Sequence, residues 1–133
     1  MKHFINLTDF DADTPKGILK HPHELKSQKF SPPQLFKGLT LAMMFDKLST
    51  RTRVSFDVAM KQLGGHTVVM SMGEMQIGGA ESVESTAKVL SRFVDGIMIR
   101  MSDHAMMEEL AGHSDIAIIN GMTNQSHPCQ IMA

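Results

Sequence analysis

The sequence predicts an α/β fold, in which a doubly wound, mainly parallel sheet of four strands carries helices on both faces. Two observations support this prediction. Short apolar runs alternate four times with stretches that have helical spacing. These runs are continuous, which is typical of parallel strands that are covered on both sides. With 133 residues, the chain is long enough for one domain with a real hydrophobic core.

The first elements are a helix, a loop and a strand. Residues 8–11 could cap the helix, and Pro15 is tolerable only in its opening turn. The buried side of this helix would consist of Ile18, Leu19 and Leu25. Residues 26–38 include two adjacent prolines and are predicted to form a loop. The apolar run at 39–45 follows and predicts the first strand.

A second helix begins directly after this strand. Ser49 stands at its N-cap position, and Gly64-Gly65 would end it. Its apolar positions recur at helical spacing and are Phe56, Ala59, Met60 and Leu63. Residues 66–70 then predict the second strand, and the glycine-rich residues 71–81 predict a loop.

The same alternation continues to the end of the chain. Ser82 would cap a third helix, whose apolar face consists of Val83, Ala87, Leu90 and Val94. Residues 95–100 predict the third strand, and Ser102-Asp103 would cap a short helix that Gly112 closes. Residues 115–120 predict the fourth strand. Because no repeat, linker or composition shift interrupts this pattern, residues 1–133 are expected to form a single domain.

The composition argues against several classes of protein. A formal net charge of -1 gives no general attraction to nucleic acid or to an acidic membrane surface. The single cysteine, Cys129, excludes an internal disulfide framework. Without a signal-peptide core or a membrane-length apolar stretch, the chain is expected to be soluble and cytoplasmic. The thirteen methionines are expected in the core, and His21 and His23 lack the neighbouring ligands of a metal site.

The start of the second helix is the main candidate site. Residues 49–53 read Ser-Thr-Arg-Thr-Arg, so hydroxyls and guanidiniums lie beside the free amides at the positive end of a helix. A phosphate group would find backbone donors and a bidentate cation there. The alternative is an ordinary capped helix with an Arg53–Asp57 pair on its exposed face.

Other candidate residues follow the remaining strands, and the carboxyl ends of parallel strands meet at one edge of a sheet. They are Gln76 after the second strand, Arg100 at the end of the third, and residues 127–130 after the fourth. Each has a simpler interpretation. Gln76 could be a solvated loop residue, Arg100 could reach solvent or pair with Asp103, and His127 could merely open a last helix. For Cys129, a packing role or a backbone contact to a ligand is preferred over a nucleophile.

These residues resemble a known family. The stretch 45–53, with its Ser-Thr-Arg-Thr-Arg, resembles the signature of the transcarbamoylases. Further motifs follow in the order and spacing of the ornithine carbamoyltransferase branch, and they are Gln76-Ile77-Gly78, Met98-Ile99-Arg100 and His127-Pro128-Cys129-Gln130. The resemblance covers essentially the whole chain. Two residues depart from the family pattern, because Leu48 replaces the usual proline and Asp46 a common glutamate.

The resemblance implies a role for each motif. Ser49, Thr50, Arg51 and Thr52 would bind the phosphate of carbamoyl phosphate. Arg100, His127 and Gln130 would hold its carbamoyl end, within a substrate-binding segment that includes Pro128 and Cys129. Arg51, Arg100 and His127 would be catalytic, because they would stabilise the charge that develops on the leaving phosphate and on the carbamoyl oxygen. Gln76 would reach into the site of an adjacent subunit of a homotrimer.

The resemblance also implies what lies outside this chain. The family binds L-ornithine with a second domain, so residues 1–133 would be the carbamoyl phosphate-binding half and would be inactive alone. Neither metal nor organic cofactor is required by this chemistry. Two alternatives stay open. One is the corresponding domain of aspartate carbamoyltransferase, against which Gln76-Ile77-Gly78 and Cys129 argue, and the other is a non-catalytic module that binds carbamoyl phosphate or another anion.

Overall fold

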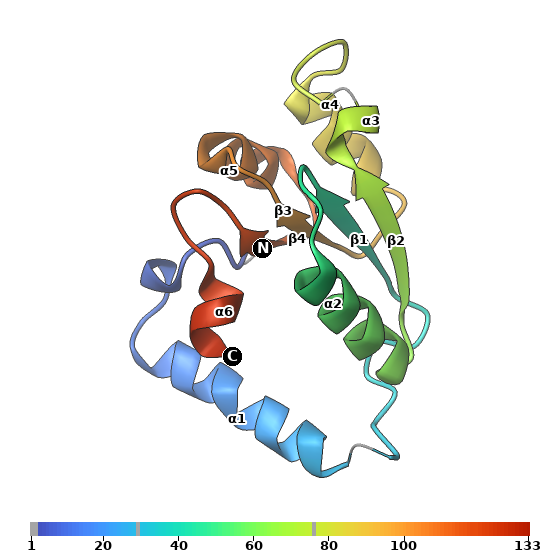
Figure 1. Ribbon diagram of the computed structural model, residues 1–133, viewed down its shortest axis with the longest axis vertical. Helices are drawn as coiled ribbons and strands as arrows, with labels where there is room; N and C mark the ends of the chain where they lie inside the picture. The colour runs from blue at the N-terminus through green and yellow to red at the C-terminus, as the bar shows by residue number, and fades with distance from the viewer. Residues whose placement is uncertain (1–2, 29, 76) are drawn as a thin grey trace.

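The computed structural model describes residues 3–28, 30–75 and 77–133 and contains a sheet of four parallel strands (Figure 1). The strands are β1 (Thr40–Phe45), β2 (His66–Ser71), β3 (Gly96–Arg100) and β4 (Ala117–Met122). Their order is β2-β1-β3-β4, so the chain moves outward from β1 to β2 and then returns past β1 to β3. This reversal confirms the predicted doubly wound α/β fold.

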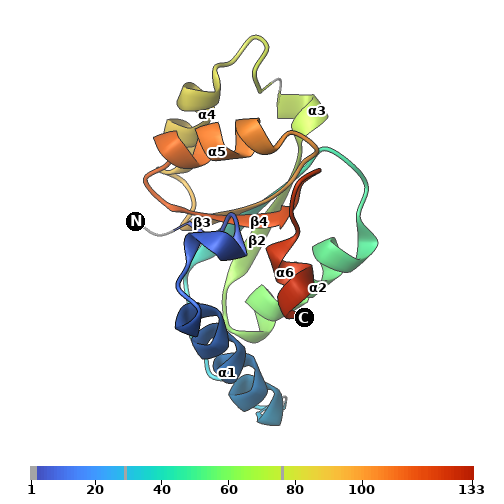
Figure 2. The same cartoon turned by 90° about the vertical axis from the view of Figure 1, so that its left-hand side faces the viewer.

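Helices connect the strands and cover the sheet. They are α1 (Asp13–Ser27), α2 (Thr50–Gln62), α3 (Met72–Met75), α4 (Val83–Leu90), α5 (His104–His113) and α6 (Pro128–Met132). Figures 1 and 2 show α4 and α5 on one face of the sheet and α2 on the other. A short 3-10 helix at Leu7–Asp9 precedes α1, and Phe4 adds a parallel bridge to Ile119 at the free edge of β4.

Alternate residues of β1 face the two hydrophobic clusters. Ala42 and Met44 belong to the larger cluster, which includes buried residues of α4 and α5. Met43 and Phe45 belong to the smaller cluster, which α2 covers with Phe56 and other side chains. The central strand β1 is therefore buried on both faces, which explains its continuous apolar run as predicted.

Two helix starts follow the predicted capping chemistry. The Ser85 amide donates to the Ser82 hydroxyl at the start of α4, at 3.1 Å. The Met106 amide donates to the Asp103 carboxylate at the start of α5, at 3.0 Å. The predicted closure of α5 at Gly112 is one residue early, and the predicted loop at 71–81 contains the short helix α3.

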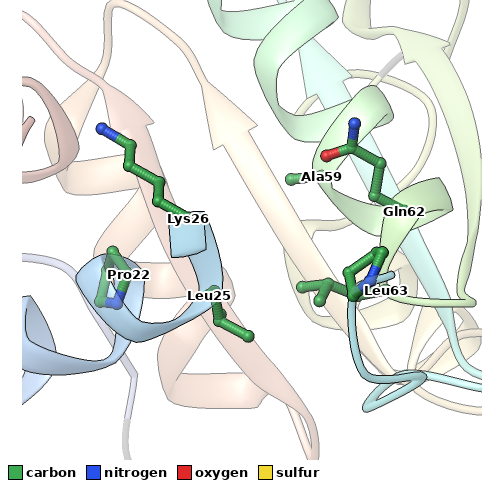
Figure 3. A pocket seen from close by; sticks show the side chains of 7 residues that line it. Pro22, Leu25, Lys26, Ala59, Gln62 and Leu63 are labelled. Carbon is green, nitrogen blue, oxygen red and sulfur yellow. The ribbon is translucent and has the colours of Figure 1, made fainter. Parts of the chain in front are cut away.

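The predicted buried side of α1 is wrong. All residues of α1 are described and none is buried, with Ile18 and Leu19 each 38% exposed. An open groove of about 610 Å³ separates the end of α1 from the end of α2 (Figure 3). Pro22, Leu25 and Lys26 lie on the α1 side of this groove, opposite residues of α2 (Figure 3). The residues of the predicted apolar stripe do lie on a helix, but no other described part of the chain buries them.

The expectation that every strand is covered on both faces is wrong for β2. This strand lies at the edge of the sheet, and its Val68 and Val69 are 46% and 40% exposed. Ala59, expected on the apolar side of α2, is exposed as well. Among the described residues, every helix is too short or too polar to cross a lipid bilayer.

Candidate functional site

Three loops at the carboxyl edge of the sheet enclose one cavity. They follow β1, β3 and β4, which end on the same side because the strands are parallel. The cavity has a volume of about 390 Å³. It is lined by Leu48, Ser49, Thr50, Arg51, Thr52, Arg100, Met122, His127 and Gln130. Seven of these residues were singled out by the sequence, whereas Leu48 was noted only as a departure from the family pattern and Met122 was not considered.

The start of α2 forms one wall of the cavity. Ser49 is the N-cap residue with extended backbone angles, φ -148° and ψ 113°, yet its hydroxyl makes no capping hydrogen bond to the described amides of the first turn. The first amides of a helix have no partner within the helix. Their N–H groups and the positive end of the helix dipole are therefore available to an anion beside Arg51.

Arg100 joins this wall from β3. Its Nη1 donates to the hydroxyl of Thr52, which is only 8% exposed, at 2.9 Å. The alternative pairing with Asp103 does not occur, because the Asp103 carboxylate caps α5. The alternative Arg53–Asp57 pair is not formed either, since Asp57 accepts hydrogen bonds from Lys61 and Thr67.

A bulge between β3 and β4 determines the position of Arg100 relative to β4. The register shifts between Ile99 and Arg100, so that Ile99 pairs with Asn120 while Arg100 pairs with Met122. Gly121 lies between these partners, and a Cβ atom there would collide with Met98 and approach the Ile99 carbonyl oxygen to 3.1 Å. Bulges of this kind redirect side chains near the ends of strands. Glycine at 121 thus permits the bulge that places Arg100 at the cavity.

His127 contributes the third side of the cavity. It is the N-cap residue of α6, with Pro128 in the first helical position, as its simpler interpretation also required. Its Nδ1 is buried and has no hydrogen-bond partner among the described residues. Burial, and secondarily the positive charge of Arg100, lower the pKa of His127 below its usual value. The imidazole is therefore neutral at pH 7 and can donate one hydrogen bond to a ligand.

The other residues of the last motif lie in different surroundings. Gln130 lines the cavity, whereas Pro128 is fully buried and does not. The Cys129 thiol donates to the Asn120 carbonyl oxygen at 3.3 Å, and burial raises its pKa to about 11. This environment agrees with packing rather than nucleophilic chemistry at Cys129. Gln76, expected to serve an adjacent subunit, lies outside the described residues.

Backbone and side-chain hydrogen bonds hold the three loops together. The Asp46 amide donates to the Arg100 carbonyl oxygen at 3.0 Å, and the Asp46 carboxylate accepts from the Ser102 amide at 2.6 Å. The Asn124 amide donates to the Ser102 carbonyl oxygen at 3.1 Å. The loop after β3 therefore lies between the other two and is bonded to both. The sequence did not predict these contacts, although a carboxylate directly after a buried strand was a signal for Asp46.

The chemistry of the cavity is that of an oxyanion site. Two guanidiniums, a helix start and hydroxyls surround it, and no carboxylate is among its described lining residues. Such groups favour a phosphate or a carbonyl oxygen that gains negative charge. Among the described residues, no three His, Cys, Asp or Glu side chains are grouped as they would be around a metal ion.

Comparison with known proteins is consistent with this chemistry. Residues 2–133 match the family model described as aspartate/ornithine carbamoyltransferase, carbamoyl-P binding domain. The chain is 48% identical over 135 residues to an ornithine carbamoyltransferase of Nitrobacter winogradskyi, covering 99% of this chain and 44% of that protein. It is 49% identical over 137 residues to one from Brucella abortus, covering 100% of this chain and 43% of that protein.

A solved structure is similar in fold as well as sequence. The ornithine carbamoyltransferase of Pyrococcus furiosus superposes with a TM-score of 0.94 at 44% identity, over 98% of this chain and 42% of that one. The chain therefore spans less than half the length of the relatives that it matches.

Proposed function

Because the chain belongs to the aspartate/ornithine carbamoyltransferase family, as a carbamoyl phosphate-binding domain, we propose that it forms the first half of an ornithine carbamoyltransferase. The complete enzyme would transfer the carbamoyl group of carbamoyl phosphate to the side-chain amine of L-ornithine and yield L-citrulline and phosphate. The observation that carries the proposal is the cavity that gathers Arg51 from the start of α2, Arg100 from the end of β3 and His127 from the start of α6.

The phosphate would bind at the start of α2. Ser49, Thr50 and Thr52 supply hydroxyls and amides, and Arg51 supplies a bidentate cation. Phosphate is the leaving group of the reaction, and its negative charge grows as the bond to the carbamoyl carbon breaks. A guanidinium and a helix start at this position stabilise that charge, so they favour the transition state as well as binding.

The carbamoyl group would bind between Arg100, His127 and Gln130. Attack by the amine on the carbamoyl carbon produces a tetrahedral species whose oxygen gains negative charge. Arg100 already donates to the Thr52 hydroxyl at 2.9 Å, so these two groups converge where that oxygen would lie. Neutral His127 would donate to the same oxygen, and Gln130 would accept from the carbamoyl NH2 and fix its plane.

The acceptor amino acid would bind through a second domain. The two curated relatives at 48% and 49% identity are named ornithine carbamoyltransferases, which favours ornithine over the aspartate alternative. We further propose that the complete enzyme acts in arginine metabolism and in the cytoplasm, with L-ornithine reaching the site from the second domain. The remaining alternative is a non-catalytic anion-binding module. Such a module would bind the ligand as the enzyme does, but it would not support transfer of the carbamoyl group.

A pair of arginine variants tests the phosphate assignment. Arg51 lines the cavity, whereas Arg53 lines a neighbouring hollow on the β2 side of the same helix start. Calorimetry with inorganic phosphate should show that Arg51→Ala weakens binding by roughly tenfold or more, as expected for a lost charge-assisted hydrogen bond. Arg53→Ala removes the same charge and should have a much smaller effect. An equal loss of phosphate affinity in both variants would show that phosphate is attracted by the positive charge in general and not by a specific contact with Arg51.

An assay of citrulline formation tests the whole proposal. The chain should be inactive alone and active when mixed with a separately produced second domain of a relative. Activity that requires both parts, and is lost with Arg100→Ala, supports the ornithine carbamoyltransferase assignment. Tight phosphate binding with no activity in any mixture would favour the non-catalytic module.

Assembly into a homotrimer is also proposed. The edge strand β2 leaves Val69 40% exposed, and nearby Leu48 and Val54 line the same hollow of about 570 Å³ as Val69. An apolar edge of this kind is typical of a contact with another chain. A neighbouring copy bound there would lie beside the start of α2, where its Gln76 could serve the cavity.

A further inference from the structure

A buried histidine lies outside the cavity and has no part in the proposed chemistry. His104 is the first residue of α5 and is 4% exposed. Its Nδ1 lies 2.8 Å from the hydroxyl oxygen of Thr123, and its Nε2 lies 3.5 Å from a carboxylate oxygen of Glu108. A buried imidazole with partners on both nitrogens has a fixed orientation.

The partner of His104 organises the turn that precedes His127. The Thr123 hydroxyl oxygen accepts from the amides of Gln125 and Ser126, at 3.2 and 3.1 Å. The Thr123 amide donates back to the Ser126 carbonyl oxygen at 2.9 Å. The Thr123 hydroxyl also lies 3.4 Å from the Ser126 carbonyl oxygen. Because the two amides occupy the lone pairs of the hydroxyl oxygen and the contact to Nδ1 of His104 is the shorter of the two at 2.8 Å, we assign the hydroxyl hydrogen to Nδ1. The Nε2 of His104 then carries the ring hydrogen and faces Glu108.

The opposite side of the turn is held by the N-terminal segment. Asn120 is fully buried, and its side-chain amide donates to the Ser126 hydroxyl at 2.9 Å. That hydroxyl donates to the Asn6 side chain at 2.9 Å. The turn at 123–126 is thus clamped between α5 and the N-terminal segment, and His127 follows it by one peptide bond.

We propose that His104 is a positioning residue, which acts through the Thr123 hydroxyl to hold the turn at 123–126 and so aims His127 at the carbamoyl end of the ligand. The inference rests on the proposed function, because it requires His127 to contact the carbamoyl group. It assigns no contact between His104 and the ligand. Loss of the His104–Thr123 bond should therefore weaken binding of the carbamoyl group. It should leave binding of the phosphate group at the start of α2 unchanged.

Two ligands separate these ends experimentally. Inorganic phosphate probes the start of α2 alone, and a stable carbamoyl phosphate analogue with a methylene bridge probes both ends. Calorimetry on the full chain gives the ratio of the two affinities. His104→Leu and Thr123→Val each remove the bond at nearly constant volume, and each should lower this ratio by roughly fivefold or more while phosphate affinity changes little. The double variant should lose no more than Thr123→Val alone, because that variant already removes the bond to His104.

Conservative variants and a stability control complete the test. His104→Asn retains a polar atom at the position of Nδ1, and Thr123→Ser retains the hydroxyl, so both should preserve most of the ratio. Leu110→Ala removes a buried side chain of the same helix from the larger hydrophobic cluster and should lower stability to urea without changing the ratio.

Each possible failure has a distinct meaning. An unchanged ratio in His104→Leu and Thr123→Val would overturn the inference, as would an equal fall in Leu110→Ala. A wild-type chain that binds the analogue no more tightly than phosphate would instead overturn the carbamoyl role proposed for His127, and the positioning role with it.

Discussion

At the scale of single residues, two histidines are held toward their neutral form. Burial is the main cause of the lowered pKa of both His3 and His127. His3 has a structural reason to stay neutral, because its Nδ1 accepts a hydrogen bond from the Ile118 amide at 3.1 Å. A protonated His3 would lose this bond, which fixes the N-terminal segment beside β4.

These two pKa shifts predict how stability depends on pH. Between the lowered pKa values and about 6.5, the usual pKa of histidine, the unfolded chain binds more protons than the folded chain. The free energy of unfolding should therefore rise with pH through this window, and the rise should be complete above about pH 7. Urea unfolding at several pH values between about 5 and 8 measures this slope. His3→Gln should make the free energy of unfolding depend less steeply on pH. An unchanged slope would show that His3 does not contribute to this pH dependence.

The thiol of Cys129 gives a second prediction at this scale. Its pKa of about 11 means that roughly one molecule in a thousand carries a thiolate at about pH 8. Alkylation by iodoacetamide should be far slower in the folded chain than in urea and should accelerate steeply toward pH 11. Rapid labelling of the folded chain near pH 8 would contradict the buried position of the thiol.

Residue types and spacing predicted much of the cavity but not its internal bonds. Ser49 to Thr52, Arg100 and His127 were identifiable because each lies at the end of an apolar strand or in the segment that follows one. The Arg100–Thr52 hydrogen bond joins residues 48 positions apart. Its formation depends on the bulge at Gly121, and nothing in the local pattern specified that bulge.

At the scale of elements, the end of α2 depends on a glycine. Gly64 follows the helix with φ +87°, a conformation that L-residues with a side chain rarely adopt, and a Cβ there would come within 2.6 Å of the Gln34 side chain. Gly64→Ala should lower the free energy of unfolding by about 1–2 kcal/mol, as measured by urea unfolding.

Gly112 offers a matched control for this prediction. It lies inside α5, where an added Cβ would meet no described atom within 4 Å apart from its chain neighbours and the backbone of its own helix. Gly112→Ala should therefore be neutral or stabilise the chain by up to about 1 kcal/mol, because alanine favours the helix. Similar losses in both variants would show that the left-handed conformation at 64 is not the cause.

Element types were predictable from periodicity, whereas the partners of each element were not. The stripe of Ile18, Leu19 and Leu25 predicted a helix correctly, but periodicity does not say what covers an apolar stripe. The exposure of β2 follows from its place at the edge of the sheet, which depends on strand order. The short helix α3 was missed because four residues, Met72–Met75, are too few to establish a period.

At the scale of the whole molecule, the edge of β2 predicts self-association. Val69→Lys places a charge on this edge and should shift the chain toward monomer in sedimentation experiments. Val89→Lys is the matched control, because Val89 is 45% exposed on α4 and does not line the hollow that contains Val69, so its replacement should leave the oligomer intact. A wild-type chain that sediments as a monomer at high concentration would contradict the proposed trimer contact.

The uncapped start of α2 has a thermodynamic consequence for the entire domain. Since the Ser49 hydroxyl does not satisfy the first-turn amides, a bound anion would complete the helix that its own N-cap residue leaves open. Phosphate binding and folding would then be thermodynamically linked. The melting temperature should therefore increase with the logarithm of the phosphate concentration. A higher phosphate concentration would therefore add to the stability of the folded domain by mass action.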